Sequence, residues 1–336
     1  MVEKITLAHG SGGKASHELI EKLFVANFGG KSLLAMEDSA VLQAGKERIA
    51  FSTDSFVVDP IFFPGGDIGS LAIHGTVNDL AMRGAKPLYI AVAMIIEEGF
   101  AYRDLETIVR SLKAGADKAG VEIVAGDTKV VQSGKADKIF INTTGIGLLD
   151  MDIDISAGNG RPGDRIILSG TMADHGTTIL CQREGLQIQG GFMSDSAPLN
   201  HMVAAMIEEC GKSIHVLRDP TRGGVGTTLN ELAQSSGVGM RIRETDLPVR
   251  DDVRGACELL GLDPLYLANE GKLLAFVEPG AVESLLAVMQ KMEYGGNAGI
   301  IGELVAEHPG QVVMQTSIGS SRIVDMLHGE PLPRIC

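Results

Sequence analysis

The sequence predicts a two-domain protein of the α/β (α+β) class, in which strands and helices alternate. Its 336 residues suffice for two domains of ordinary size, each with its own hydrophobic core. Between residues 51 and 148, apolar runs of strand length alternate with longer segments of helical periodicity. The alternation begins again after a turn at residues 161–164. These observations predict domains at residues 1–155 and 156–326, followed by a tail at 327–336.

The composition limits the kinds of partner and compartment. A net charge of −14 and a pI near 5.0 argue against nucleic acid and anionic membranes, which attract basic patches. Neither an export signal nor an apolar run of roughly 18 residues is found, so we expect no membrane partner. The four cysteines are far apart and form neither a zinc pattern nor a compact disulfide framework, which favours a reducing cytoplasm. They are Cys181, Cys210, Cys257 and Cys336.

A glycine-rich loop precedes the first amphipathic segment, at residues 17–28. Its residues are His9, Gly10, Ser11, Gly12 and Gly13. A turn of this kind that leads into a helix can offer backbone N–H groups to phosphate, although the Walker A spacing is absent. On this pattern alone, a phosphate-binding loop and an ordinary flexible loop both remain open.

Carboxylates follow two predicted strands of the first domain. The run Phe51–Thr53 has the character of a strand end, and Asp54 follows it directly. The strand at residues 121–125 continues into Gly126, Asp127, Thr128 and Lys129, so that a second strand end carries a carboxylate. Alternation would point Asp127 and Lys129 to one face, where a simple ion pair is the alternative to a functional role.

The helix predicted to open at Asp67 carries Asn78 and Asp79, and it is expected to end at Gly84. Small residues along it allow another group to approach the backbone closely, while Asp79 brings a negative charge there. A cation resolves this conflict, and Mg²⁺ binds few carboxylates together with phosphate oxygens. Asp38, before a short apolar run, would by itself be a turn residue.

The remaining elements complete the first domain and continue the alternation through the second domain. The expected helices and strands are 101–119, 138–148, 165–168, 199–210, 225–234, 239–243, 251–260 and 273–277. Arg222 stands before two glycines at a helix start and suits an anion, with an ion pair to Asp219 as the alternative. Glu270 precedes the last of these strands; in isolation it would be a solvated turn charge. His74 and His175 lie among small and apolar residues and are expected in the core.

The last ten residues lack strand alternation and contain two prolines. Such an extended tail can span up to ~30 Å. Its final residue, Cys336, carries a thiol that no prenylation signal explains, because prenylation requires three residues after the cysteine. A stiff arm that ends in a nucleophile suggests a carrier. The adjacent terminal carboxylate is expected to raise the pKa of the thiol.

Taken together, the segments HGSGG, FSTDS, VNDLAMRGAKP, GDTKVV, DPTRGG, ANEGK and the terminal PRIC resemble one family. This is the HypE family of hydrogenase maturation factors, within the aminoimidazole ribonucleotide synthetase superfamily, and the resemblance covers residues 7–336. Several motifs are shared with aminoimidazole, formylglycinamidine and selenophosphate synthetases and with thiamine monophosphate kinase. The terminal cysteine motif singles out the HypE family.

The resemblance implies a homodimer in which the N-terminal sheets pair into a β-barrel flanked by α/β C-terminal domains. ATP and Mg²⁺ are expected near the domain and subunit junctions. A carbamoyltransferase partner, HypF, carbamoylates the terminal thiol in this family, and the carbamoyl group is then dehydrated to a thiocyanate. The cyano group passes to iron on a HypC and HypD complex and becomes a cyanide ligand of a [NiFe]-hydrogenase.

The resemblance also assigns roles to residues. Metal ligands are expected at Asp38, Asp54, Asp79 and Asp127. Nucleotide contacts are expected at His9, Gly10, Ser11, Gly12, Gly13, Asp54, Asn78, Asp79, Asp127 and Thr128. Glu270 matches the residue proposed as the base in this family. Lys129 matches the proposed partner of that base, which stabilises charge or relays a proton. Cys336 matches the residue that carries the substrate covalently.

Two rival functions remain open at this point. A small-molecule synthetase or kinase of the same superfamily would have a free substrate pocket and would tolerate loss of Cys336. A non-catalytic sulfur or iron carrier would use the tail as a docking arm, and its acidic residues would be structural.

Overall fold

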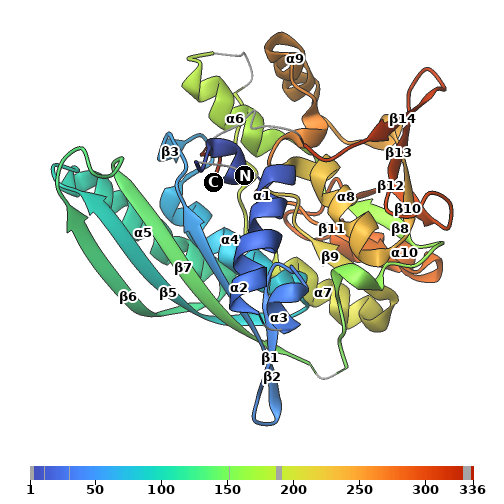
Figure 1. Ribbon diagram of the computed structural model, residues 1–336, viewed down its shortest axis with the longest axis horizontal. Helices are drawn as coiled ribbons and strands as arrows, with labels where there is room; N and C mark the ends of the chain where they lie inside the picture. Colours follow the sequence, from blue (N-terminus) through green and yellow to red (C-terminus); the bar gives the residue numbers. More distant parts are fainter. Residues whose placement is uncertain (1–3, 11, 30, 151, 187–190, 328–333) are drawn as a thin grey trace.

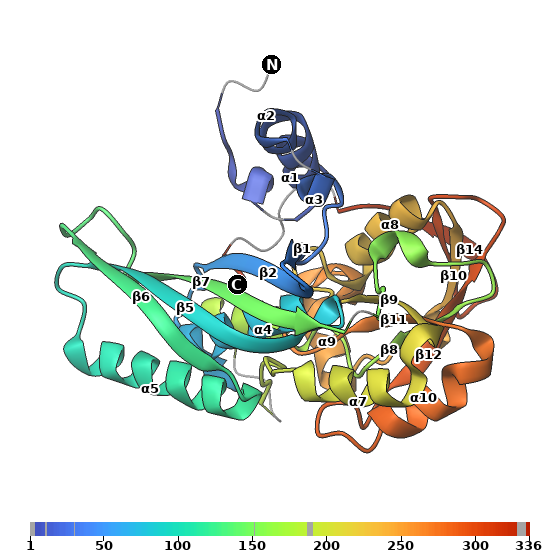
Figure 2. The same cartoon turned by 90° about the horizontal axis from the view of Figure 1, so that it is seen from below.

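The computed structural model describes residues 4–10, 12–29, 31–150, 152–186, 191–327 and 334–336. The described residues form two large sheets that lie side by side, each with helices of its own (Figure 1). No helix in these ranges is both long and apolar enough to cross a membrane. Short helical segments at the N-terminus project from the first sheet, and the last of them contacts its first strand (Figure 2). They are η1 (Leu7–Gly10), α1 (Lys14–Leu19), η2 (Ile20–Val25), α2 (Ala26–Phe28) and α3 (Lys31–Leu34).

The first sheet has five strands in the order β1-β2-β7-β5-β6. Only β5 and β6 pair in parallel; the other neighbours are antiparallel. Its strands are β1 (Ala40–Ala44), β2 (Glu47–Phe56), β5 (Lys86–Glu97), β6 (Glu122–Val131) and β7 (Ile139–Leu149). A separate small hairpin joins β3 (Phe62–Phe63) to β4 (Gly66–Asp67). The first half is therefore the mixed α/β unit that the sequence predicts.

Two helices cover one face of this sheet, α4 (Ile68–Met82) and α5 (Tyr102–Ala119). Asp67 begins α4 through a capping box, accepting the N–H groups of Gly69 and Ser70. Nearly all of α4 is buried, because it lies between the sheet, α5 and the second half of the chain. The helix ends as predicted at Gly84, whose φ of 75° is readily adopted only by glycine.

The second sheet has seven strands in the order β14-β13-β10-β12-β8-β11-β9, with only β10 and β13 parallel. Its strands are β8 (Arg165–Leu168), β9 (Ile214–Arg218), β10 (Gly239–Arg243), β11 (Leu274–Val277), β12 (Gly299–Val305), β13 (Val312–Gln315) and β14 (Ser321–Val324). The accompanying α-helices are α6 (Asp174–Arg183), α7 (Asn200–Cys210), α8 (Gly224–Ser236), α9 (Asp251–Leu260) and α10 (Val282–Met289). Short turns of helix are η3 (Ala157–Asn159), η4 (Gly211–Ser213), η5 (Glu244–Asp246), η6 (Pro264–Tyr266) and η7 (Pro279–Ala281).

Two strands are longer than their sequence suggests. Asp54 pairs with Thr143 of β7 inside β2, and Asp127 pairs with Ala93 of β5 inside β6. The expectation that both carboxylates stand at strand ends is therefore wrong. The physical reason is that the neighbouring strands supply backbone partners beyond the apolar runs, so the hydrogen-bonded ladder continues through polar residues.

The two halves share buried contacts. The amide of Asn78 in α4 accepts the N–H of Leu199 at 2.8 Å and donates to the carbonyl of Ala197 at 3.0 Å. Glu37 forms a buried ion pair with Arg83 at 3.1 Å and accepts the N–H of Ala157 at 3.0 Å. These contacts fix the second half against α4, and the candidate site lies at this junction.

Candidate active site at the junction of the two halves

Three carboxylates meet where the two halves join. Asp38 precedes β1, Asp79 lies near the end of α4, and Asp219 follows β9 directly. One oxygen from each lies within 4.8 Å of the others. Asp79 Oδ2 accepts a hydrogen bond from Ser52 Oγ at 2.6 Å, and Asp38 Oδ1 contacts Arg218 Nε at 2.7 Å. We call Asp38, Asp79 and Asp219 the carboxylate triad.

The triad carries more negative charge than its surroundings balance. Burial raises the pKa of Asp38 and of Asp79 well above the usual range, and the neighbouring carboxylates add to both effects. Burial likewise raises the pKa of Asp219 to about 6, with Arg218 acting against it. Asp38 Oδ2 is buried and has no hydrogen-bond partner among the described residues. An unpartnered oxygen among three clustered carboxylates is the environment that a divalent cation such as Mg²⁺ fits.

Asp54 links the triad to the rest of the site. It lies on the same face of β2 as Ser52, which donates to Asp79, because side chains two residues apart share a face. Its charge contributes to the raised pKa values of Asp79, Glu270 and Cys336, so these groups lie within electrostatic range of Asp54.

The chain ends inside this site. The carbonyl oxygen of Cys336 accepts the N–H of Val57 at 2.9 Å, just beyond the end of β2. Burial raises the pKa of the Cys336 thiol to about 12, against the effect of Arg222 and with further contributions from Glu270 and Asp54. The predicted direction of the shift is observed, but its main cause is burial. The resting thiol is therefore protonated and a weak nucleophile.

Glu270 lies on a tightly held loop before β11. Asn269 ties this loop down by accepting the N–H of Ala173 at 2.7 Å and donating to the carbonyl of Pro220 at 2.8 Å. The Glu270 side chain is only 3% exposed, and its Oε1 has no hydrogen-bond partner among the described residues. Burial raises the pKa of Glu270 well above its usual range, and nearby carboxylates, Asp195 first, add to the shift.

Asp195 fixes the backbone of the Glu270 loop. Its carboxylate accepts the N–H groups of Glu270 and Gly271, each at 3.2 Å, and forms an ion pair with Lys272 at 3.0 Å. Burial acts to raise the pKa of Asp195, but Lys272, His175 and the N–H of Glu270 together outweigh burial and hold the pKa below its usual value. Asp195 thus remains ionised and fixes the backbone that carries Glu270.

The glycine-rich loop packs against Arg222. Arg222 Nη1 donates to the carbonyl of Gly10 at 3.1 Å, which is a different contact from the ion pair with Asp219 considered above. A Cβ on Gly12 would lie 2.7 Å from Arg222 Cβ, and Gly12 has a φ of 82°, so this position requires glycine. The electrostatic interaction with Cys336 is the largest effect that raises the pKa of Arg222. The predicted residue Ser11 lies outside the described residues.

Other loop residues predicted to contact nucleotide have local partners. His9 Nδ1 contacts the N–H of Thr6 at 3.1 Å. A Cβ on Gly13 would meet the carbonyl oxygen of Leu327 at 2.5 Å, so the loop also touches the root of the tail. The amide of Asn78 makes hydrogen bonds with the backbone at residues 197–199, so it links α4 to the second half of the chain.

The structure does not bring Asp127, Thr128 and Lys129 to the triad of the same chain. All three lie exposed on β6, the edge strand, and Lys129 Nζ contacts Asp127 at 2.6 Å. Three strand spacings separate β6 from β2, which carries Asp54; at 4.7–4.9 Å each they amount to about 14 Å. Within one chain, the ion pair that the sequence offered as an alternative is the contact observed.

The sequence interpretation missed Asp195 and gave Asp219 no role of its own. Asp219 follows β9 directly, and the rule used for strand-end carboxylates could have found it. Asp195 has no local pattern, because its partners lie about 75 residues further along the chain. His74 and His175 are buried as expected, and His175 Nε2 contacts the carbonyl of Ile335 at 2.8 Å.

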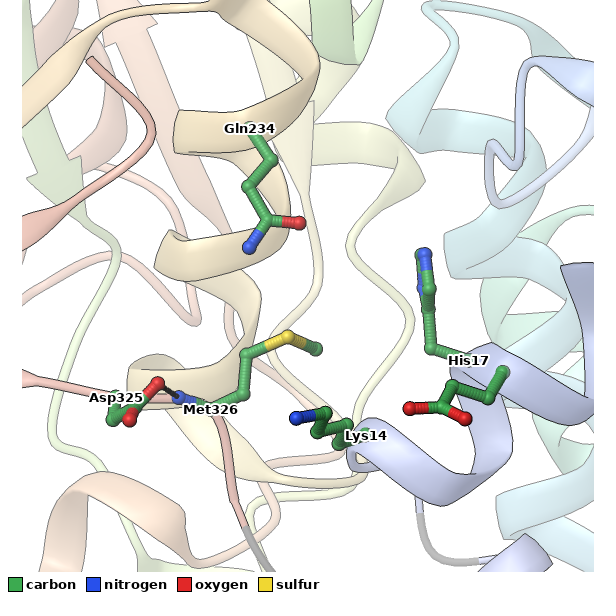
Figure 3. A pocket seen from close by; sticks show the side chains of 6 residues that line it. Lys14, His17, Gln234, Asp325 and Met326 are labelled. Atoms are coloured by element: carbon green, nitrogen blue, oxygen red, sulfur yellow. Dashed lines mark hydrogen bonds between the residues drawn. The ribbon is translucent and has the colours of Figure 1, made fainter.

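A pocket of about 280 Å³ opens beside the glycine-rich loop, between α1 and α8 (Figure 3). Lys14, at the start of α1, is bound through its N–H to the carbonyl of Leu327 at 3.3 Å. The pocket lining carries charges of both signs. The lining residues are Lys14, His17, Glu18, Gln234, Asp325 and Met326.

Comparison with known proteins identifies the family. Residues 36–149 match the N-terminal domain, and residues 161–315 the C-terminal domain, of AIR synthase related proteins. The chain is 52% identical over 332 residues to carbamoyl dehydratase HypE of Azotobacter vinelandii, covering 99% of this chain and 97% of that protein. It is 46% identical over 340 residues to carbamoyl dehydratase HypE of Escherichia coli K12, covering all of both. The chain belongs to the HypE family.

Solved HypE structures agree with this assignment. HypE in complex with ATP has a TM-score of 0.84 and 50% identity, covering 99% of this chain and 100% of that one. HypE from a HypE–HypF complex has a TM-score of 0.88 and 50% identity, covering 92% and 99%. Thiamine monophosphate kinase from Aquifex aeolicus, at 17% identity and a TM-score of 0.67, shares the fold. The resemblance predicted from the motifs is confirmed.

Proposed function

We propose that this chain is an ATP-dependent carbamoyl dehydratase whose substrate is its own C-terminal cysteine. The observation that carries the proposal is the position of Cys336, whose carbonyl accepts the N–H of Val57 just beyond β2. Its thiol is within electrostatic range of Arg222, Glu270 and Asp54. The relatives named carbamoyl dehydratase match over the full length, and one HypE structure contains ATP.

The reaction converts a thiocarboxamide on Cys336 into a thiocyanate. The amide oxygen is a poor leaving group, so the terminal phosphoryl group of ATP is first transferred to it and ADP leaves. Both N–H protons are then lost, the C–O bond breaks, and phosphate departs as the C≡N bond forms. The products are the thiocyanate, ADP, phosphate and one proton, which accounts for every atom.

The carboxylate triad and Asp54 would hold Mg²⁺ in this scheme. A bound magnesium ion supplies positive charge to the phosphate oxygens during transfer. The chain's own contribution is to gather the ligands, with Ser52 and Arg218 fixing Asp79 and Asp38. The glycine-rich loop at residues 9–13 would cover the phosphates with its backbone N–H groups.

Glu270 is the base in the proposed reaction. Burial raises the pKa of its carboxyl group well above the usual range, and neighbouring negative charges add to the shift. Two of those charges belong to Asp54 and Asp219. Neutralising them with a bound cation would lower the pKa of Glu270 toward the working range of a general base. Glu270 would then accept a carbamoyl N–H proton while Asp195 holds its backbone in place.

The proposal includes a homodimer that brings Asp127, Thr128 and Lys129 to the site of the other subunit. It is supported by large apolar side chains on the sheet face opposite α4 and α5, which a monomer would leave in water. We call these residues the apolar sheet face: Phe51, Tyr89, Ile95, Ile146 and Leu148. The exposed edge strand β6 is a second reason to expect pairing, since unpaired edges invite association.

The proposed partners follow from the chemistry. HypF would carbamoylate Cys336, and a solved HypE–HypF complex supports this pairing for the family. A HypC and HypD complex would accept the cyano group on iron. The four cysteines of this chain are free, which suits a reducing cytoplasm.

The test is the intact mass of the C-terminal peptide. Incubation with the carbamoylating partner should add one carbamoyl group to Cys336, and ATP should then make the peptide lighter by one water. A thiocyanate vibration should accompany the loss. ATP turnover that does not depend on a modified tail would instead support a small-molecule kinase or synthetase.

A further inference from the structure

A short loop at residues 194–199 contacts both α4 of the first half and the Glu270 loop of the second half. It contains no helix or strand of its own, and α7 begins directly after it at Asn200. Its conformation therefore depends on the contacts that it makes with other segments. We call residues 194–199 the bridging loop.

The bridging loop holds the backbone of Glu270 on both sides. Asp195 accepts the N–H of Glu270 at 3.2 Å, and the N–H of Ala197 donates to the Glu270 carbonyl at 3.3 Å. The two segments pack backbone against backbone, because a Cβ on Gly271 would lie 1.8 Å from the carbonyl oxygen of Asp195. Only glycine fits there. The direction in which the Glu270 carboxyl group points therefore depends on the bridging loop.

Two side chains of α4 hold the other side of the bridging loop. Asn78 is 1% exposed; its Oδ1 accepts the N–H of Leu199 at 2.8 Å, and its Nδ2 donates to the carbonyl of Ala197 at 3.0 Å. His74 lies one turn earlier on the same face of α4, and its Nδ1 contacts Ser196 Oγ at 3.0 Å. One face of this buried helix thus fixes the loop at three successive points.

The same helix carries a member of the carboxylate triad. Asp79 follows Asn78 directly, and its Oδ2 accepts the hydrogen bond from Ser52. Asn78 Nδ2 also lies 3.5 Å from the carbonyl oxygen of Glu270 itself. Adjacent residues of one helix, whose backbone hydrogen bonds keep it stiff, therefore hold the triad and the loop that carries the base.

We propose that Asn78 is a positioning residue for the dehydration, which couples the carboxylate triad to Glu270 by holding the bridging loop in place. This inference rests on the proposed function and deepens it, because the base must reach the carbamoyl N–H while the phosphates are held at the triad. Displacement of a reacting group by about 1 Å can cost about 100-fold in rate. In this role Asn78 acts on the reaction through Glu270 rather than by contact with the nucleotide.

The first test follows a single turnover of the full-length protein after the carbamoyltransferase partner has modified its tail. Saturating Mg²⁺ and ATP start the reaction, and the loss of one water from the C-terminal peptide gives the rate of dehydration. Asn78→Ala should bind ATP as tightly as wild type, by calorimetry on the unmodified protein, but should dehydrate its tail roughly 10- to 100-fold more slowly. A wild-type rate, or loss of ATP binding by the folded variant, would overturn the proposal.

The matched control is Asn200→Ala. Asn200 also joins the two halves through a buried amide, which donates to the carbonyl of Ala119 at 2.8 Å, but this contact leads to α5 rather than to the Glu270 loop. Both alanine variants remove a buried hydrogen bond between the halves and should lose stability in urea. Asn200→Ala should nevertheless dehydrate its tail within about twofold of the wild-type rate. A rate as slow as that of Asn78→Ala would show that any loosening of the junction slows the reaction, and would overturn the proposal.

A milder variant covers the case in which Asn78→Ala does not fold. Ser196→Ala removes only the contact between the bridging loop and His74, so it should bind ATP normally and slow dehydration by roughly two- to fivefold. An unchanged rate of dehydration in Ser196→Ala would then overturn the proposal.

The second test separates the two chemical steps. In the first turnover of Asn78→Ala, ADP should form at the wild-type rate while the loss of water lags behind it, which is also the pattern expected of Glu270→Gln. If ADP formation slows as much as the loss of water, Asn78 acts on phosphoryl transfer and the coupling to Glu270 is refuted. Wild-type protein that fails to dehydrate its carbamoylated tail would instead refute the proposed function, so the two failures are distinguishable.

Discussion

Removing the charge of Asp219 should stabilise the nucleotide-free protein and at the same time abolish its response to Mg²⁺ and ATP. Asp219 is buried, and its pKa is raised from an ordinary value near 3.8 to about 6. Above pH 6 the folded protein must therefore carry a carboxylate whose ionisation is easier in the unfolded chain. Asp219→Asn keeps the shape of the protonated acid and removes this cost.

The magnitude follows from the shift. The pKa of Asp219 rises from 3.8 to about 6 on folding. At 1.36 kcal/mol per pKa unit, this shift corresponds to about 3 kcal/mol in the free energy of unfolding. Because the charges of Asp38 and Asp79 can relax when Asp219 changes, we expect a gain of about 1–3 kcal/mol in the free energy of unfolding at pH 7.5. The sign of the linkage makes the gain largest above pH 6, smaller as the pH falls toward 4, and absent below it.

The assay is urea denaturation of wild type and Asp219→Asn at pH 4, 5, 6 and 7.5, with and without Mg²⁺ and ATP. Asp152→Asn, an exposed carboxylate in the loop that follows β7, is the matched control and should change neither curve. Without Mg²⁺ and ATP, the variant should have the larger free energy of unfolding at pH 7.5. Addition of Mg²⁺ and ATP should raise the free energy of unfolding of the wild type but not that of the variant. Two results would refute a cation site in which the carboxylates repel one another. One is a variant that is less stable than the wild type at pH 7.5 without ligand, and the other is a variant that Mg²⁺ and ATP stabilise as much as they stabilise the wild type.

Asp79→Asn should abolish ATP turnover while leaving the fold intact, measured by phosphate release and circular dichroism; wild-type turnover would make Asp79 structural. Glu270→Gln should bind ATP normally, by calorimetry, yet leave the carbamoylated tail undehydrated, and loss of ATP binding would move Glu270 to the metal site. Cys336→Ala should keep its oligomeric state and ATP binding but accept no carbamoyl group; modification that persists in this variant would exclude the carrier role. Phe51→Glu places a charge on the apolar sheet face and should shift a dimer toward monomer in light scattering, whereas a wild type that is already monomeric would contradict the dimer.

The position of the tail explains why an unreactive thiol suits this chain. Burial and nearby carboxylates keep Cys336 protonated, so it does not react indiscriminately while it rests in the site. Carbamoylation must therefore occur where the thiol is activated, which is the partner's site in the proposed cycle. The carbamoylated tail end is neutral at the sulfur and can return to the same site without the cost of burying a charge there.

Much of the molecule could be predicted from local sequence. The strand at residues 165–168, the strand at 239–243 and the helix at 251–260 have the bounds that their apolar patterns predict. Gly84 ends α4 because only glycine readily adopts its positive φ. The motifs around Asp54, Asp79 and Glu270, together with the terminal cysteine, were sufficient to identify the family. Each of these depends on neighbouring residues, so each is visible in a short stretch of sequence.

Only the tertiary structure decided which of these groups meet. Asp219 joins Asp38 and Asp79 because β9 of the second sheet ends against α4 of the first half. Asp195 supports Glu270 across 75 residues, and Ile335 reaches His175 across 160 residues, distances over which no local pattern operates. Conversely, Asp127 and Lys129 carry a clear motif but lie on an edge strand away from the triad of their own chain. The sequence by itself determined which residues can perform the chemistry, because side-chain type and local periodicity are written in it. Long-range packing determined their arrangement, because burial and strand pairing depend on segments that are far apart along the chain.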